Sequence, residues 1–265
     1  MTGAPPPSLW LDGPKRARRA PLEGDATADV AIVGAGIAGL SAAYALAREG
    51  ARPIVLERDE IAGAASGRNA GFILAGVAEN YVAACRRYGP ERTSRIWRFT
   101  VANRVLLAAI AQRHRIECDL AWKGSVQQAG DDEEWEEIRE SARALGSPNV
   151  RVSLDPEHRS AVYAEDGEMH PVRFVRGLAD AAEGLGARIH ESSPVIEVAR
   201  DRVATRAGTV RAGAVVIATN AFTAGLTSAR IVPIRGQVLA TAPVAARIFP
   251  RPVYAHRGYR YWRQT

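Results

Sequence analysis

The stretch from Val30 to Glu57 constrains the fold of this chain more than any other. It contains, in this order, the patterns of an apolar strand, a glycine turn, an Ala-rich helix and a second strand that ends in an acid. Its glycines follow the pattern Gly-x-Gly-x-x-Gly at Gly34, Gly36 and Gly39. In such a βαβ unit the first glycine permits a tight turn, the second admits a pyrophosphate close to the backbone, and the third lets the helix pack against the strand. The sequence therefore predicts a nucleotide-binding βαβ unit.

Two parts of this unit supply polar groups for a nucleotide. A helix that begins near Gly36 points its free N–H groups and the positive end of its dipole at the phosphates, so we include Ile37 and Ala38 in the predicted site. Glu57 lies about 20 residues further on, where a carboxylate can accept hydrogen bonds from ribose hydroxyls. We add its neighbour Arg58 to the predicted cofactor-binding residues.

Two other interpretations of this stretch compete with nucleotide binding. The segment Val30–Ala47 is apolar and resembles a membrane span, which needs about 18 such residues. Its glycines have phosphate-loop spacing and a second strand follows at once, so we expect no membrane span. The unit could also be a buried motif without a ligand, but an acid that closes the second strand has little structural purpose there.

The composition is that of an ordinary globular protein, with 47% apolar and 24% charged residues among 265, enough for one or two domains. Cys85 and Cys118 fit no metal-binding spacing, and a reduced cytoplasmic setting is the simplest interpretation. The acidic run Asp131–Glu137 could suggest a metal site, but we interpret it as the solvated face of an amphipathic helix. No metal is predicted.

The net charge of +6 raises the question of nucleic-acid binding. Only Lys15 and Lys123 are lysines among the 35 basic residues, and the arginines are scattered rather than gathered with aromatic side chains. We interpret the arginine excess as coding bias and expect no nucleic-acid partner. One basic cluster, at 15–19, is interpreted as part of a solvated N-terminal arm that Trp10 anchors.

Periodicity and turn residues predict the remaining elements. The Gly- and Ser-rich segment 61–76 is predicted to be a loop that passes close to a ligand, and 151–170 is predicted to be irregular. The apolar strand at 215–218 is expected to be a fully buried parallel strand. Helices are predicted over 79–112, 131–145 and 172–185, and further strands over 118–122, 125–128, 187–191, 194–200, 203–205 and 209–211.

Four segments carry a family resemblance that spans residues 10–262. They are the βαβ unit with Glu57, the loop Ala65-Ser66-Gly67-Arg68-Asn69-Ala70-Gly71-Phe72, His170-Pro171 with its following helix and Gly186-Ala187-Arg188-Ile189, and residues 216–221 with 232–237. Together they resemble the D-amino-acid-oxidase-type family of FAD-dependent oxidoreductases, which includes glycine and sarcosine oxidases. The resemblance is closest to the bacterial γ-glutamylputrescine-oxidase-like branch.

The resemblance implies an α/β fold in which a Rossmann-like FAD-binding domain is joined to an α+β substrate domain with a mixed sheet. The implied boundaries are an arm at 1–29, a discontinuous FAD-binding domain at 30–80 and 171–228, and a substrate domain at 81–170 and 229–265. The substrate domain is expected to be incomplete at its C-terminus.

The resemblance also implies roles for residues outside the βαβ unit. The loop residues Ser66, Gly67, Arg68, Asn69 and Ala70 are implied to line the diphosphate and the isoalloxazine ring of FAD. A Gly-rich loop suits both groups, because each needs backbone at close range. Arg68 could offset the diphosphate charge, and Ala70 departs from the glycine that the family prefers.

Three further residues join the implied FAD site. Val195 lies on a strand whose backbone would bracket the adenine. Thr219 and Asn220 end an apolar strand at its carboxyl edge, where open α/β sheets bind ligands.

The implied reaction removes hydride from the carbon that bears an amine and yields an imine, with the electrons passing to the flavin. The substrate would be a small amine or amino acid, and no catalytic residue is assigned; His170 and His256 are interpreted as structural. Two alternatives stay open: an NAD-linked dehydrogenase that uses the same glycine motif, and a non-catalytic remnant or nucleotide-binding fragment. The substrate's identity, the electron acceptor, covalent attachment of FAD and the oligomeric state are not predicted.

The last residues, Tyr259–Thr265, are expected to form a strand that leads into a hairpin but has neither turn nor partner. Exposed aromatic edge strands are an aggregation liability. We therefore expect this sequence to be an N-terminal fragment or a truncated product.

Overall fold

We obtained the fold as a computed structural model, which describes residues 8–13, 16–146, 150–234 and 236–265. Several residues to which the sequence assigns a role lie outside the described residues. They are Lys15 of the basic cluster, Ser147 and Pro148, which are expected to end the helix predicted over 131–145, and Arg235 of the segment 232–237. The chain forms two compact units. The first unit comprises residues 1–69, 114–117 and 171–240, and the second comprises 70–113, 118–170 and 241–265.

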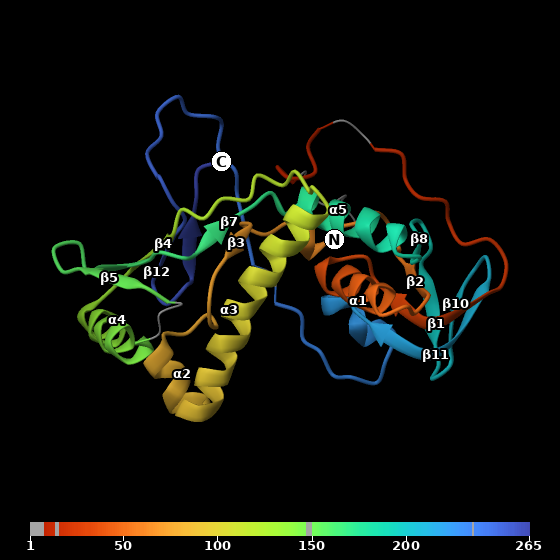
Figure 1. The fold of residues 1–265 in the computed structure, drawn as a ribbon, viewed down its shortest axis with the longest axis horizontal. Coiled ribbons are helices and arrows are strands. Elements are labelled where there is room, and N and C mark those ends of the chain that lie inside the picture. The colour runs from red at the N-terminus through yellow and green to blue at the C-terminus, as the bar shows by residue number, and fades with distance from the viewer. Residues whose placement is uncertain (1–7, 14–15, 147–149, 235) are drawn as a thin grey trace. The chain divides into compact units, whose positions relative to one another are not determined.

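The first unit is built on a six-stranded sheet with the order β8-β2-β1-β11-β10-β9 (Figure 1). The strands β8, β2, β1 and β11 run parallel, and β10 and β9 complete the sheet in antiparallel pairing. Their bounds are β1 Ala26–Val33, β2 Pro53–Leu56, β8 Arg188–His190, β9 Val195–Val198, β10 Arg202–Thr205 and β11 Thr209–Ile217.

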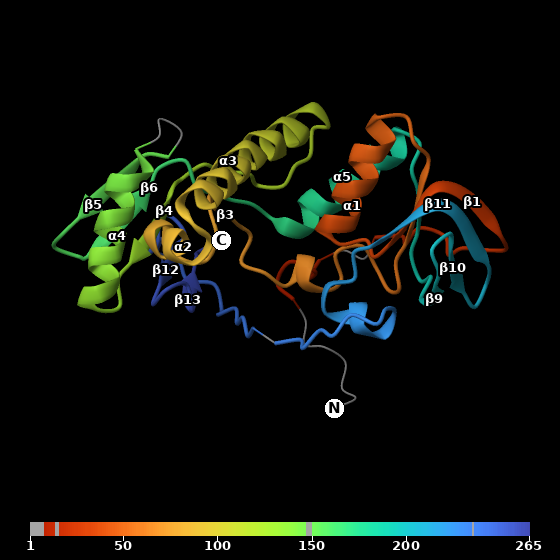
Figure 2. The same ribbon diagram turned by 90° about the horizontal axis from the view of Figure 1, so that it is seen from below.

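Two helices pack against each other beside this sheet, α1 (Ile37–Arg48) and α5 (Pro171–Gly184) (Figures 1 and 2). The helix α1 forms because its sequence is rich in Ala and Leu, which are strong helix formers. It buries Leu40, Ala43 and Tyr44. The predicted helix 172–185 is confirmed by α5, which begins at Pro171, as a proline at the first helical position allows.

The strand β11 differs from its prediction in length and burial. The two strands predicted at 209–211 and 215–218 are one strand, which pairs with β1 from Ala26 to Val33. The predicted parallel direction is confirmed, but full burial is wrong, because Ala214 is exposed and Val215–Ile217 are only half-buried. Apolar composition alone did not distinguish a strand covered on both faces from one covered on a single face.

The second unit contains a mixed five-stranded sheet with the order β13-β12-β4-β6-β5 and a two-stranded sheet of β3 and β7. The predicted mixed sheet is therefore confirmed, since β12 and β4 are parallel and the other pairs are antiparallel. The bounds are β3 Phe72–Ile73, β4 Ser125–Gln128, β5 Val152–Asp155, β6 Ser160–Tyr163, β7 Gly167–Glu168, β12 Val253–Ala255 and β13 Arg260–Trp262.

Three predicted elements of the second unit are wrong. The segment 151–170 is not irregular, because it contains β5, β6 and β7. Residues 118–122 form a single bridge, from Ala121 to Glu168, instead of a strand. The helix predicted over 79–112 is interrupted at Gly89, which has a φ of +83° and separates α2 (Tyr81–Tyr88) from α3 (Pro90–Arg113).

The terminal strand has a partner, contrary to expectation. β13 pairs antiparallel with β12, with Val253 opposite Trp262. In the turn between them, His256, Arg257 and Gly258 have positive φ angles. The aromatic residues therefore belong to a hairpin, whose turn residues carry no Asn-Gly or Asp-Gly signal that the sequence could have revealed.

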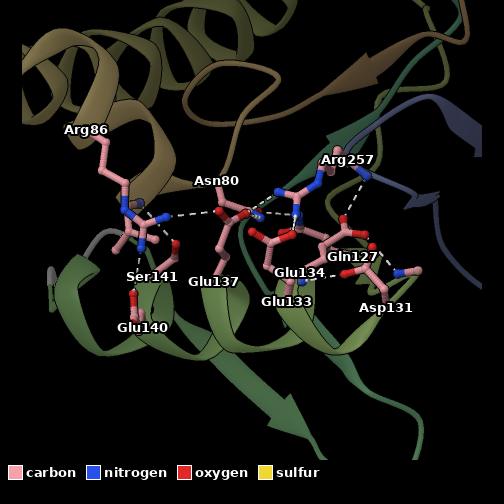
Figure 3. A network of polar contacts seen from close by, with 12 residues as sticks. Asn80, Arg86, Gln127, Asp131, Glu133, Glu134, Glu137, Glu140, Ser141 and Arg257 are labelled. Atoms are coloured by element: carbon pink, nitrogen blue, oxygen red, sulfur yellow. Dashed lines mark hydrogen bonds and ion pairs between the residues drawn. The ribbon is translucent and has the colours of Figure 1, made fainter.

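The acidic helix α4 (Asp132–Leu145) is not simply a solvated face (Figure 3). Glu134 and Glu137 are buried, at 1% and 7% exposure. Glu134 accepts hydrogen bonds from the backbone N–H of Gly130 (2.8 Å) and of Arg257 (2.7 Å), and Glu137 pairs with the Arg257 guanidinium. These acids bind the β12–β13 hairpin to α4 rather than facing water.

The described part of the N-terminal arm is largely exposed, but it also makes specific contacts with the first unit. The Arg19 side chain is 12% exposed and pairs with Glu183 and Asp180 of α5, each at 2.5 Å. The carboxyl group of Glu191, itself 1% exposed, accepts hydrogen bonds from the Arg19 backbone N–H (2.8 Å) and from Arg16 (3.0 Å). The basic cluster therefore attaches the arm to the first unit.

Candidate cofactor-binding site

The candidate site lies at one edge of the parallel sheet in the first unit. Val33, the last residue of β1, is in register with Leu56 of β2 and with Ile217 of β11. Because parallel strands end at a common edge, the segments that follow them, beginning at Gly34 and Glu57 in the first two cases, come together there. This is the edge at which open α/β sheets bind ligands.

The glycine turn between β1 and α1 leaves no room for side chains at two positions. Gly34 has a φ of +104°, and a Cβ there would lie 2.8 Å from the backbone oxygen of Ala218. A Cβ at Gly39 would lie 1.9 Å from the backbone oxygen of Gly34. Glycine is therefore required for the tight turn and for the close approach of helix and strand, as the motif predicts.

The N-terminus of α1 is exposed and carries no side-chain cap. Gly36 occupies the N-cap position and has no side chain to cap the helix, and Ile37 and Ala38 are exposed. The Ile37 N–H donates to the hydroxyl of Ser66 at 2.9 Å. The first turn therefore offers backbone donors, a positive dipole end and one hydroxyl to an anion.

Glu57 is held in place by the backbone around it. One carboxylate oxygen accepts from the Ala35 N–H at 2.8 Å, and the other accepts from the Asp59 N–H at 3.0 Å. Its own backbone pairs with His190 and Ser193. Each carboxylate oxygen can accept a further hydrogen bond, so the group is oriented and still able to bind ribose hydroxyls.

The Arg58 side chain contacts Asp59 and Phe222. It is exposed, pairs with Asp59 at 2.9 Å, and its guanidinium lies 4.4 Å from the ring centroid of Phe222. Phe222 belongs to the 3-10 helix η2 (Asn220–Gly225), which follows the end of β11. The structure therefore places Arg58 beside the segment after β11.

The loop after β2 returns to the glycine turn. Its start is joined to that turn by a hydrogen bond from the Ala62 N–H to the Ala35 oxygen at 3.2 Å. The short 3-10 helix η1 (Ala65–Gly67) then brings Ser66 to the N-terminus of α1. Gly67 is buried, and a Cβ there would lie 2.2 Å from the backbone oxygen of Ala62.

Arg68 and Asn69 bond to the loop that carries them. Arg68 donates to the Gly63 oxygen at 3.3 Å, and the Asn69 amide donates to the oxygens of Ala65 (3.1 Å) and Ser66 (2.9 Å). Ala70 is the first residue of the second unit, so the structure does not place it relative to the others.

The remaining predicted residues lie at two further strand ends. Val195 begins β9, two residues after Ser193, whose N–H donates to the backbone oxygen of Glu57 at 2.7 Å. Thr219 is half-buried, and its hydroxyl lies 2.9 Å from that of Thr223. Asn220 is exposed and has a φ of +47°. The structure thus brings Val195 near Glu57, and Thr219 and Asn220 to the end of β11.

Sequence reasoning missed Glu191 and Ser8. Glu191 is a second acid at a strand end and, unlike the half-buried Glu57, it is buried. One of its oxygens accepts from the Ile61 N–H at 2.8 Å. Its position at the end of the strand predicted over 187–191, like that of Glu57 at the end of its own strand, is a signal that could have identified it. Ser8 donates to the backbone oxygen of Gly67 at 2.5 Å, and no sequence pattern marks it.

A cavity of about 630 Å³ also occurs in the first unit, lined by α5 and residues 114–117. None of the predicted cofactor residues lines it.

Within the described parts of the chain, no group of three or more His, Cys, Asp or Glu residues could hold a metal ion. Among the same residues, no helix combines the length and the apolar character that crossing a bilayer requires.

Comparison with known proteins identifies the class to which this fold and site belong. The family described as "FAD dependent oxidoreductase" matches residues 29–265, and the chain belongs to this family. Its cofactor, as the sequence predicts, is FAD. The match includes all fifteen residues of the predicted cofactor site.

Curated relatives in bacteria are similar over most of this chain. A probable oxidoreductase OrdL of Haemophilus influenzae is 28% identical over 83% of the chain and 57% of the relative. The gamma-glutamylputrescine oxidoreductase of Escherichia coli is 28% identical over 74% of the chain and 50% of the relative. The glycine oxidase of Geobacillus kaustophilus is 27% identical over 87% of the chain and 65% of the relative. The chain thus spans between half and two thirds of the length of these relatives.

Solved structures agree with the fold. The crystal structure of glycine oxidase from Geobacillus kaustophilus has a TM-score of 0.69 over 87% of this chain and 66% of that chain, at 23% identity. An L-amino acid deaminase from Proteus vulgaris has a TM-score of 0.62 over 78% of this chain and 51% of that chain, at 19% identity. These similarities support the α/β fold with several sheets.

The residues present fit part of an FAD molecule. Gly34 and Gly39 allow the tight turn and the close helix–strand packing that such a site needs. The first turn of α1 offers N–H donors to a diphosphate, and Glu57 offers acceptors to a ribose. In chemical type, these groups fit the ADP portion of FAD.

Proposed function

We propose that this protein is a FAD-dependent oxidoreductase that oxidises the carbon–nitrogen bond of a small amine or amino acid to an imine. The observation that carries the proposal is the oriented Glu57 carboxylate beside the open N-terminus of α1, in a chain of the FAD-dependent oxidoreductase family. The relatives' names support the amine part, since glycine and gamma-glutamylputrescine both carry amino groups.

The cofactor set we propose divides into two parts. The ADP portion would be held by the glycine turn, the first turn of α1, Glu57 and the strand at Val195. The flavin side would be lined by the loop residues 66–70, with Thr219 and Asn220 at the end of β11. We propose the boundaries 30–80 and 171–228 for the FAD-binding domain, and 81–170 and 229–265 for the substrate domain.

Bound FAD would supply the capacity to accept two electrons, which no amino acid side chain of this site can provide. The chain's own residues bind and orient it. Glu57 fixes the ribose through acceptors, Ser66 and the α1 N–H groups donate hydrogen bonds to the diphosphate, and the loop brings backbone close to a flat ring. A cytoplasmic location and small-molecule substrates complete the proposal.

A titration of the purified protein with FAD tests the cofactor part. We expect saturable quenching of flavin fluorescence and a yellow protein with the visible absorption of oxidised flavin. NAD should not compete. Absence of saturable FAD binding would favour a non-catalytic remnant, and preferential binding of NAD would favour an NAD-linked dehydrogenase.

The amine part needs a second assay. The FAD-loaded protein is incubated without oxygen with a panel of primary amines, secondary amines and amino acids, and bleaching of the flavin absorption is followed. We expect bleaching by at least one nitrogen compound and none by the corresponding alcohols. Bleaching by alcohols alone would contradict oxidation of a carbon–nitrogen bond.

A further inference from the structure

The N-terminal arm contacts the loop that we assign to the flavin side of the site. Ser8 donates from its hydroxyl to the backbone oxygen of Gly67 at 2.5 Å. The indole N–H of Trp10 donates to the backbone oxygen of Asn69 at 2.6 Å. Both acceptors lie within the predicted cofactor loop, and both donors lie almost 60 residues earlier in the sequence, so the contact is tertiary.

A second contact joins the arm to the start of the same loop. The buried carboxylate of Glu191 accepts from the Ile61 N–H through one oxygen, at 2.8 Å. Its other oxygen accepts from the Arg19 backbone N–H at 2.8 Å and from the Arg16 side chain at 3.0 Å. A single carboxylate therefore links the arm to the first residue of the loop.

Between these two attachments the loop carries the residue that meets α1. Ser66 accepts from the Ile37 N–H at 2.9 Å, next to Gly67. A shift of the loop would therefore move the hydroxyl at the helix N-terminus together with the backbone around it. Because a loop that is already ordered loses less entropy on binding a ligand, such attachment favours affinity.

We propose that the arm, through Ser8 and Trp10 at one end and Glu191 at the other, positions the loop 61–69 for FAD. This inference rests on the proposed function and extends it, since it makes the arm a working part of the cofactor site. Ser8 and Trp10 are positioning residues, and we assign them no contact with FAD.

The variants S8A and W10F test the proposal. S8A removes one donor and little volume, whereas W10F removes the indole donor together with part of the ring. A neutral hydrogen bond of this kind corresponds to about a 5-fold change in an equilibrium constant. We expect each variant to raise the dissociation constant of FAD about 5-fold. S8T keeps the hydroxyl and should restore the affinity, a rescue that a general loss of packing would not produce.

Hydrogen exchange of the FAD-free protein provides a readout that does not depend on the cofactor. The amides of Gly67 and Arg68 donate within the loop, to Ala64 and Ala65. We expect faster exchange of these amides in W10F and S8A, with exchange in α4 unchanged. The matched control is Trp122→Phe in the second unit. Trp122 is 42% exposed, and we expect this substitution to change neither the exchange of the loop amides nor the dissociation constant of FAD.

The outcomes separate the two proposals. If the unaltered protein binds FAD and the variants bind it equally well, the arm does not position the loop. Unchanged exchange in both variants overturns the inference by itself. If no protein binds FAD but exchange of the loop rises in the variants, the attachment of the arm is supported and the proposed function fails.

Discussion

At the scale of single residues, two buried or half-buried acids at strand ends have different roles. Glu57 accepts two backbone N–H groups and keeps acceptor capacity at the ligand-binding edge. Glu191 is buried, and its carboxylate oxygens accept hydrogen bonds from the arm and from the Ile61 N–H. Position after a β-strand is common to both, so the sequence pattern alone does not separate a ligand-binding acid from a structural one.

The most severe single substitution we predict is Gly39→Ala. Its Cβ would lie 1.9 Å from the Gly34 backbone oxygen, so helix and strand must separate. We expect FAD binding to be lost and the free energy of unfolding to fall by about 1–3 kcal/mol. Fluorescence titration and urea unfolding measure these effects. Ser41→Ala, on the exposed face of α1, is the control, and equal behaviour of the two variants would contradict the prediction.

Glu57→Gln tests the acceptor role. The amide can accept through only one atom, so one of the N–H groups of Ala35 and Asp59 loses its partner and the ribose loses an acceptor. We expect the dissociation constant of FAD to rise about 10-fold or more, with a smaller effect on stability. Isothermal titration calorimetry measures the change, and Glu49→Gln, an exposed acid after α1, should have no effect.

Asp166 makes stability depend on pH. It is 2% exposed, and burial raises its pKa to about 6, although the Ser125 hydroxyl and the Arg104 guanidinium, each at 2.7 Å, act to lower the pKa. A raised pKa means that the folded state binds more protons than the unfolded state between about pH 4 and 6. The Asp166 contribution to stability is therefore greatest below pH 4 and falls as the pH rises through 6.

The size of this effect follows from the shift from 3.8 to about 6, roughly 3 kcal/mol. Urea unfolding between pH 4 and 8 of the protein and of Asp166→Asn measures it. We expect the difference in stability between them to change by about this amount over that range, with most of the change below pH 6.5. Parallel pH curves would show that Asp166 does not titrate there.

At the scale of elements, the turn of the β12–β13 hairpin is held by α4. Arg257 donates its backbone N–H to Glu134 and pairs through its guanidinium with Glu137 and Glu133 (Figure 3). Asn80, before α2, donates to the same Glu137 oxygen as Arg257, at 3.4 Å. The charged residues of α4 thus provide structural contacts that an amphipathic pattern does not reveal.

Replacing Arg257 by Ala should loosen this hairpin. The variant leaves the nearly buried carboxylate of Glu137 without its closest cation, and we expect a loss of about 1–3 kcal/mol in the free energy of unfolding. Arg139→Ala removes an exposed i,i+3 pair on the same helix and should cost less than about 0.5 kcal/mol. Thermal unfolding compares the two, and equal losses would show that burial does not decide the effect.

At the scale of the whole molecule, the two units carry different parts of the proposed function. All but one of the predicted cofactor residues belong to the first unit, and Ala70 begins the second. Because the chain spans half to two thirds of its curated relatives, cofactor binding and turnover are separate questions for it.

FAD should stabilise the first unit by an amount that rises with the logarithm of its concentration relative to the dissociation constant. At a concentration 100 times the dissociation constant, a ligand that binds only the folded state adds about 2.7 kcal/mol. We expect exchange of the core amides in β1 and α1 to slow accordingly. Adenosine monophosphate is the control, since it lacks the diphosphate and should protect these amides less. No slowing at saturating FAD would contradict the assignment of the site.

The sequence by itself determined the βαβ unit, the edge at which Glu57 lies and the family, because these depend on local patterns: apolar runs, glycine spacing and an acid at a strand end. Only the tertiary structure decided the short strands at 151–170, the pairing of the last strand, the burial of Glu134 and Glu137, and the attachment of the arm. The β5–β6 and β12–β13 pairings are local hairpins whose turn residues carry no Asn-Gly or Asp-Gly signal, so the sequence pattern did not reveal them. The burial of Glu134 and Glu137 and the attachment of the arm depend on partners far away in the sequence, such as Arg257 and Glu191, and a buried charged side chain is stable only where such a partner satisfies it.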